Sequence, residues 1–242
     1  MFRSRKIKRE DINVNGMTIE LIRSKRKSLS LEIGSEGIKA RAPMRMNIAL
    51  IIDFINSRKN WLEARLQERP APLEKLVLES GSELLFKNKA VTLTILEGRR
   101  GKVQLNENEL VLPVIQSSRP LDDTIKSKLI KWYKKTAVEE LEQRIKHYAP
   151  LMDVVRPAQD KPKVREYKRR WGSCDHLGSL SFNWRIIMAP QDVLDYVVIH
   201  ELAHCHEFNH SKRFWKLVTK QMPDWKEKHD WLQNNGGLLY RF

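Results

Sequence analysis

Residues 197–215 of the chain read VVIHELAHCHEFNHSKRFW, and this stretch decides how the C-terminal half is expected to fold. It contains His200, Glu201 and His204 in the spacing H-E-x-x-H. On a helix, positions i and i+4 lie on one face, one turn apart, so both imidazoles are predicted to project together. Two such imidazoles are close enough to share a Zn²⁺ ion. Glu201 can then reach a metal-bound water as general base without taking a coordination site.

A catalytic zinc site normally needs a third protein ligand and one open position. His206 and His210 are the two local candidates. On a continued helix, His206 points away from His204, although it remains possible if the helix stops at His204. His210 lies just before Ser211, a good N-cap, where the chain is expected to turn back, so we favour His210 as the third ligand. Cys205 has an unfavourable direction from His204 and is expected to be a free thiol.

The surroundings of the motif support a metal site. An apolar run, VLDYVVI, precedes it and predicts a helix with a buried face. Residues 186–211 contain no Lys or Arg, although the chain has 45 of them against 30 Asp and Glu, a net charge of +15. A local absence of cations in so basic a protein suits a bound dication. The alternative is a pair of ordinary solvated or core histidines.

Working outward, the pattern predicts a helix from Gln191 to about residue 207 and another from Ser211 to just before Pro223. A strand is expected over residues 180–190. A long amphipathic helix is expected over about 124–148, capped by Asp122 or Asp123 and ended by Pro150. Its predicted apolar stripe comprises Leu129, Trp132, Tyr133, Ala137, Leu141 and Ile145.

The N-terminal half is expected to be rich in strands. Alternating apolar and polar residues predict strands over residues 17–23, 28–33, 37–43, 83–88, 90–98, 101–108 and 109–115. One helix should begin at Asn47 and be closed by Pro70 and Pro72. No internal repeat of 20 to 50 residues is apparent. The order of elements indicates an α+β protein with a β-rich N-terminal subdomain, 1–120, and a second domain, 121–242.

Four motifs carry a resemblance to a known family. RRWGSC at 169–174, LSFNWRI at 180–186, DYVVIHELAH at 195–204 and NHSKRFW at 209–215 resemble the YgjP-like family of predicted metal-dependent hydrolases. These are relatives of the SprT-like and minimal gluzincin metallopeptidases. The resemblance covers most of the chain, and Cys205-His206 is the visible departure from the family pattern.

The resemblance implies a zincin-like catalytic domain over 121–242, with a long helix, a β-hairpin and the HExxH helix. It also implies His200, His204 and His210 as zinc ligands and Glu201 as catalytic base. In that architecture the active-site helix lies beneath a small sheet whose edge strand can pair with an extended peptide. Residues 178–185 are the candidate edge strand.

Other residues carry weaker hypotheses. Arg170 and Trp171 lie just before the turn into the candidate edge strand and are candidates for contacting substrate, although Trp171 could equally be a core residue. Arg170 could stabilise an oxyanion. Residues 161–170 hold six basic side chains against Glu166 alone, which suits either phosphate binding or a solvated strand face.

The favoured interpretation is a cytoplasmic, zinc-dependent hydrolase of the metallopeptidase type that acts on a peptide or protein. One alternative keeps the metal but hydrolyses a phosphate-bearing substrate such as a nucleoside triphosphate. Another is a nucleic-acid-associated protein with a structural zinc site, which the lack of Cys among the candidate ligands disfavours. No apolar stretch is long enough to span a membrane, and two cysteines cannot make a disulfide framework.

Overall fold

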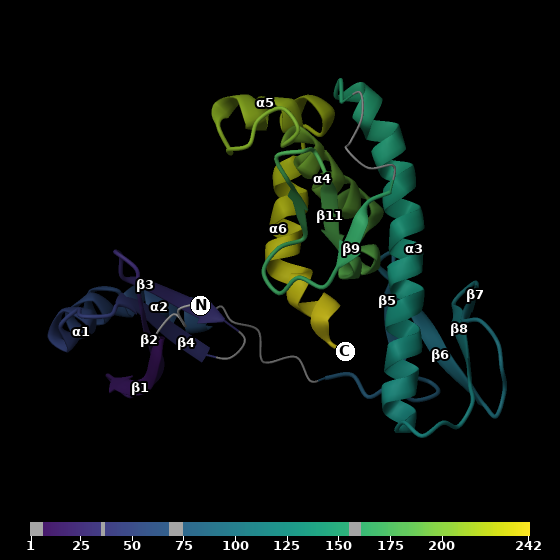
Figure 1. The fold of residues 1–242 in the computed structure, drawn as a ribbon, viewed down its shortest axis with the longest axis horizontal. Coiled ribbons are helices and arrows are strands. Elements are labelled where there is room, and N and C mark those ends of the chain that lie inside the picture. Colours follow the sequence, from purple (N-terminus) through teal and green to yellow (C-terminus); the bar gives the residue numbers. More distant parts are fainter. Residues whose placement is uncertain (1–6, 35–36, 68–74, 155–160) are drawn as a thin grey trace, which may run out of the picture. The chain divides into compact units, whose positions relative to one another are not determined.

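The computed structural model describes residues 7–34, 37–67, 75–154 and 161–242, and it divides into two compact units, 1–73 and 74–242 (Figure 1). This division lies earlier in the chain than the boundary at 120 expected from the sequence. The strands between Glu83 and Val114 share a hydrophobic core with Ile125 and Leu129 of the long helix that follows them. Packing therefore joins these strands to the second unit.

The first unit is a four-stranded sheet with two helices. Its elements are β1 (Lys8–Val14), β2 (Met17–Ser24), β3 (Ser30–Gly34), β4 (Gly37–Pro43), α1 (Ile48–Ser57) and α2 (Lys59–Gln67). The strand order is β1-β2-β4-β3, with β2 and β4 parallel and both outer pairs antiparallel. The core joins sheet residues such as Ile19 and Leu21 to Ile51, Ile55 and Leu62 of the helices.

Two features of this unit differ from the sequence-based expectation. The helix begins as predicted, because the side chain of Asn47 accepts a hydrogen bond from the backbone N–H of Ala49, but Arg58 divides it into α1 and α2. Strand β1 was not expected, since its sequence, KREDINV, is mostly charged. Pro70 and Pro72, the expected end of the helix, lie outside the described residues.

The second unit begins with a sheet of the same topology. It contains β5 (Glu83–Phe86), β6 (Lys89–Glu97), β7 (Gln104–Asn106) and β8 (Glu109–Val114) in the order β5-β6-β8-β7. Here too the central pair is parallel and the outer pairs are antiparallel. The two sheets therefore share strand order and directions, a repeat that the sequence does not reveal.

The remaining elements of the second unit are arranged around helix α4 (Gln191–Ala203). They are α3 (Leu121–Leu151), β9 (Lys163–Arg165), β10 (Gly172–Cys174), β11 (Leu180–Asn183), the 3₁₀ helix η1 (Trp184–Met188), α4 (Gln191–Ala203), α5 (Lys212–Gln221), α6 (Trp225–Asn235) and the 3₁₀ helix η2 (Gly236–Tyr240). Helix α4 contacts α3, α5, α6, β10 and η1. Figure 1 draws it among α3, α5 and α6. Its residues from Val193 to Ile199 are all buried.

Helix α3 follows the predicted stripe, and Leu129, Tyr133 and Ala137 are among its buried residues. Pro120 occupies its N-cap position, however, without a capping side chain, while Asp122 and Asp123 lie in its first turn. Its side chains also hold α4 in place. Arg144 donates two hydrogen bonds, of 2.6 and 2.5 Å, to the carboxylate of Asp195, which is only 6% exposed.

The predicted α+β class is confirmed, but two element lengths are not as expected. The strand expected over 180–190 ends at Asn183 and continues as η1, and α4 ends at Ala203 rather than near 207. Among the described residues, no helix combines the length and apolar character needed to cross a membrane.

Candidate metal centre

Three histidines meet at the C-terminal end of α4. His200, His204 and His210 each offer a ligand atom, and these atoms all lie within 4.8 Å of one another. The Nε2 atoms of His200 and His210 are 3.1 Å apart. The structure thus brings together the three residues that the sequence predicted as ligands, in a group that could hold a metal ion.

The turn between α4 and α5 explains how His210 returns to the other two. His204 is the C-cap of α4, and its Nδ1 donates a 2.9 Å hydrogen bond to the backbone carbonyl of Glu207. Ser211 then caps α5 by accepting a hydrogen bond from the backbone N–H of Phe214. With Nδ1 of His204 engaged by a carbonyl, Nε2 is left for an ion, which is the usual arrangement for a ligating histidine.

Phe214 packs against all three imidazoles. It is fully buried, and its ring centroid lies 4.9, 4.6 and 4.7 Å from those of His200, His204 and His210. Trp215 stacks on His210 at 5.7 Å. Phe214 was not predicted to belong to the site. The helical spacing after Ser211 indicates that this residue is buried, but it does not indicate which side chains it contacts.

The surroundings favour the neutral forms of His200 and His210. Burial, together with the neighbouring His204 and His210, lowers the pKa of His200 to about 3. Burial also lowers the pKa of His210. Neutral imidazole is the form that binds a metal, so this electrostatic environment suits the chemistry of the group.

Glu201 is enclosed between α4 and β10. It is only 5% exposed, and burial raises the pKa of its carboxyl group to about 8, whereas the charge of Arg170 and the backbone N–H of Cys174 lower it. Among the described residues, no group hydrogen-bonds to its Oε2 atom. A Cβ added to Gly172 would lie 2.5 Å from its Oε1, so only glycine allows β10 to pass this close.

His206 and Cys205 lie outside the histidine group. The Nε2 of His206 donates a 2.8 Å hydrogen bond to the carbonyl of Met152, just beyond α3, and this contact anchors the turn after α4. The Sγ of Cys205 lies 3.8 Å from the Sγ of Cys174 in β10. Early termination of α4 thus leaves His206 in a structural contact.

A cavity of about 370 Å³ opens over the three histidines and Glu201. Arg170 and Trp171 both line it, so the structure brings the two candidate substrate residues to the same space. Trp171 also packs against the core and lies 5.6 Å from the ring of Tyr240, whereas the guanidinium of Arg170 lies 4.9 Å above the ring of Tyr167.

Tyr196 of α4 and three residues of α6 complete the cavity wall. The residues from α6 are His229, Leu232 and Gln233. No helix was predicted there, although Trp225 and Leu232 have the i, i+7 spacing of one helical face. The wall of the site that α6 forms was therefore not predicted from the sequence.

The predicted edge strand is wrong. β11, which covers most of residues 178–185, is the central strand of its sheet and pairs with β10 on one side and β9 on the other. Among the described strands, the one with an open edge beside Glu201 is β10, which was too short to recognise by alternation.

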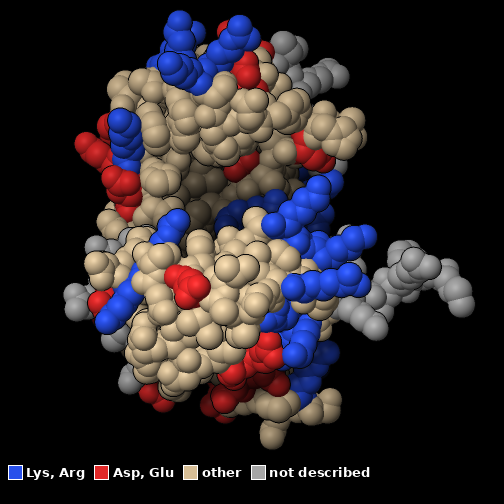
Figure 2. Space-filling model, turned by 90° about the vertical axis from the view of Figure 1, so that its left-hand side faces the viewer, with Lys and Arg blue, Asp and Glu red and all other residues tan. Residues whose placement is uncertain are grey.

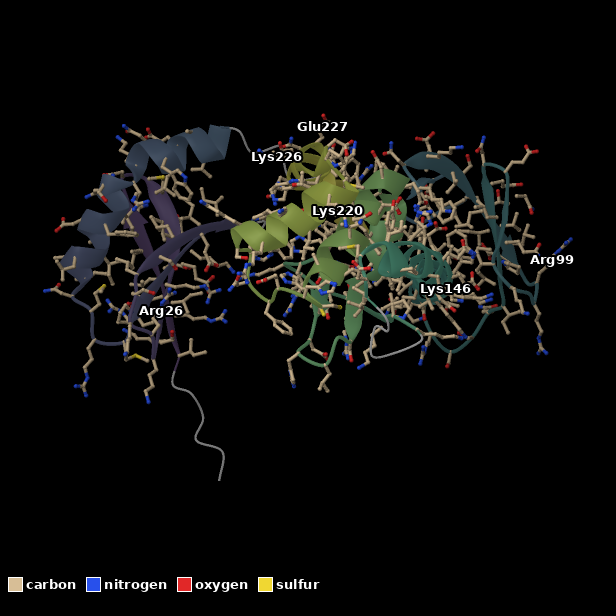
Figure 3. All side chains as sticks on the ribbon, turned by 90° about the horizontal axis from the view of Figure 1, so that it is seen from above. Arg26, Arg99, Lys146, Lys220, Lys226 and Glu227 are labelled. Carbon is tan, nitrogen blue, oxygen red and sulfur yellow. The ribbon has the colours of Figure 1, made fainter. Side chains whose placement is uncertain are left out.

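The cavity lining holds little of the positive charge of the described residues. Lys and Arg gather in groups on the face drawn in Figure 2, with Asp and Glu between them. Figure 3 labels exposed charged residues such as Arg99 and Glu227, which point outward. Among the described residues that line the cavity, Arg170 is the only Lys or Arg.

The chain is similar to a known metallopeptidase domain family. The family model of the YgjP-like metallopeptidase domain matches residues 27–235. Among solved structures, the crystal structure of the zymogen of abylysin, a metallopeptidase of Pyrococcus abyssi, is 24% identical, with a TM-score of 0.37, and covers 39% of this chain and 93% of its own. A comparison with curated proteins gives no match.

Proposed function

The chain belongs to the YgjP-like metallopeptidase domain family, and on that premise we propose that it is a zinc-dependent peptidase with Glu201 as its general base. The observation that carries the proposal is the position of a buried carboxylate directly beside a group of three histidines, under a strand with an open edge. Each part has a role in peptide hydrolysis by such a site, and all three border one cavity.

His200, His204 and His210 would hold the ion. Three nitrogen ligands with a remaining open position match a catalytic rather than a structural zinc site, which is usually closed by four ligands. When bound there, Zn²⁺ supplies a Lewis acid that polarises the scissile carbonyl and lowers the pKa of a water molecule. Phe214 keeps the three rings in place, because it contacts all of them.

Glu201 would move the proton. It accepts a proton from water at a carboxylate oxygen and passes it to the leaving amine of the peptide. Its Oε2 has no competing hydrogen bond within the described part of the chain, so it is available for that exchange. Burial favours the protonated carboxyl group, and Arg170 and the backbone N–H of Cys174 oppose it by favouring the ionised carboxylate that a base requires.

The substrate would lie along β10. This strand pairs with β11 on one side, and its other edge can accept the backbone of an extended peptide. Gly172 lies against Glu201, so a peptide paired with β10 would pass the proposed base. Trp171 and Arg170 precede β10 and border the cavity, where they would contact the bound peptide.

A phosphate-bearing substrate fits the cavity less well. A nucleoside triphosphate carries several negative charges, but within the described chain only one cationic side chain, Arg170, lines the space. The cavity of about 370 Å³ is also near the lower limit for small-molecule sites, roughly 300–1,000 Å³. A peptide can pair with the open strand edge and so extend beyond the cavity, whereas a nucleotide has no peptide backbone to pair with a strand.

The test combines metal content with turnover. We expect Glu201→Gln to retain zinc but lose hydrolysis of peptide substrates, and His204→Ala to lose both. Glu207→Gln is the matched control, because within the described part of the chain the Glu207 side chain forms only a long contact of 3.9 Å with the largely exposed Arg213. Zinc is measured by elemental analysis, and the same proteins are screened against nucleoside triphosphates. Full activity of Glu201→Gln would refute the assigned base.

A further inference from the structure

The two cysteines of the chain lie together beside the proposed active site. Cys174 is the last residue of β10, and Cys205 directly follows His204. Their Sγ atoms are 3.8 Å apart, although the residues are separated by 31 positions in the sequence. Both residues are partly buried, and Cys174 also lines the cavity.

We propose that Cys174 and Cys205 form a reversible disulfide when the protein meets a peroxide, and that this bond slows the enzyme. Formation of the bond depends only on the two thiols. Its effect on turnover rests on the proposed peptidase function.

The chemistry balances with hydrogen peroxide as the oxidant. One cysteine sulfur attacks a peroxide oxygen, the O–O bond breaks, and a sulfenic acid and one water are produced. The second sulfur then attacks the sulfenic sulfur, the S–O bond breaks, and a second water leaves with the remaining thiol proton. Two thiols are oxidised by two electrons, and one peroxide is reduced to two waters. A dithiol reductant reverses the reaction.

The positions of the two residues allow the bond to close. A disulfide requires the sulfurs to be about 2.05 Å apart, so each needs to move by only about 0.9 Å from the present separation of 3.8 Å. Cys174 begins the turn between β10 and β11, and Cys205 begins the turn after α4. Neither residue therefore lies inside a long regular element that would resist such a movement.

Closing the bond would disturb the proposed base and one proposed ligand. Cys205 is adjacent to His204, and Cys174 lies two residues after Gly172. The backbone at Gly172 already leaves no room for a Cβ beside Glu201. Drawing the end of β10 toward the end of α4 would displace the Glu201 carboxylate, and misplacement of about 1 Å can lower turnover by about 10²-fold.

The first experiment follows the bond itself. The full-length, zinc-loaded protein is treated with hydrogen peroxide, and its intact mass, free thiols and non-reduced peptide map are recorded before and after dithiothreitol. We expect loss of two hydrogens, loss of both thiols and a Cys174–Cys205 linked peptide, all reversed by the reductant. Retention of both thiols, or oxidation of either sulfur to sulfinic acid without a linked peptide, would overturn the proposal.

The second experiment follows activity. Wild-type turnover should fall at least about tenfold on oxidation and return on reduction. Cys174→Ser and Cys205→Ser each remove one partner, so the ratio of oxidised to reduced activity should stay near one in both variants. A linked peptide without any change in turnover would overturn the regulatory part. If the reduced protein hydrolyses no peptide, the proposed function fails, whereas the mass measurement still decides the disulfide.

Discussion

The contact between Gly172 and Glu201 gives a sharp prediction. In Gly172→Ala, the added Cβ would lie 2.5 Å from Oε1, 2.6 Å from Cγ and 2.7 Å from Cδ of Glu201. Such contacts are not tolerated, so the Glu201 side chain must move by about 0.5–1 Å. Overpacking of this kind destabilises a protein by about 1–3 kcal/mol. A displacement of the same size at a general base is expected to lower kcat by about 10²-fold.

The assay measures urea unfolding, zinc content and peptide turnover on the same preparation. Zinc content should be unchanged, because the three atoms nearest to the added carbon all belong to Glu201. Gly101→Ala is the control, since its added carbon would meet Pro113 Cγ at 3.0 Å in the sheet of β5–β8, away from the histidines. It should lose some stability but no turnover. Wild-type kcat in Gly172→Ala would refute the reasoning.

Three further predictions concern the support of the site. Phe214→Ala should lower the free energy of unfolding by about 3–5 kcal/mol and weaken zinc binding, measured by urea titration and by competition with a chelator. Arg144→Met leaves the nearly buried carboxylate of Asp195 without its charged partner and should cost about 3 kcal/mol in the same titration. The third concerns pH. Folding raises the Glu201 pKa from 4.5 to about 8, because the buried carboxyl group is favoured in its protonated form. The contribution of this group to the free energy of unfolding is therefore fully present below pH 4.5 and is lost as pH rises through 8. The metal-free wild type should therefore lose stability relative to metal-free Glu201→Gln between these pH values, by at most about 1.4 kcal/mol per pH unit, and a flat difference would contradict the assigned pKa.

The parts of the site that depend on local spacing could be predicted from the sequence. His200 and His204 share a helix face because of the helical period, and Ser211 marks the turn that returns His210. Both rules act over a few residues. The buried stripe of α3 follows for the same reason, since its period persists over several turns.

The parts that depend on distant partners could not be predicted. β10 has three residues, too few for alternation to show, and its position at the sheet edge is set by pairing with β11 alone. The division of the chain into compact units also depends on distant partners, because Ile125 and Leu129 pack on strands that precede them in the chain. The contact of Cys174 with Cys205 likewise arises only when β10 meets α4.

All three candidate ligands lie within residues 200–210, and this has a consequence for the order of events in folding. A loop of about ten residues closes in roughly 10–100 ns, so one helical hairpin could capture an ion before the rest of the unit has assembled. The carboxylate of Glu201 acquires its final surroundings only when β10, almost 30 residues earlier, docks against α4. We therefore expect ion capture and assembly of the proposed base to be separable steps. A preparation can be fully loaded with metal yet contain molecules that are not competent to react, so the active fraction must be counted by titration with a tight-binding inhibitor.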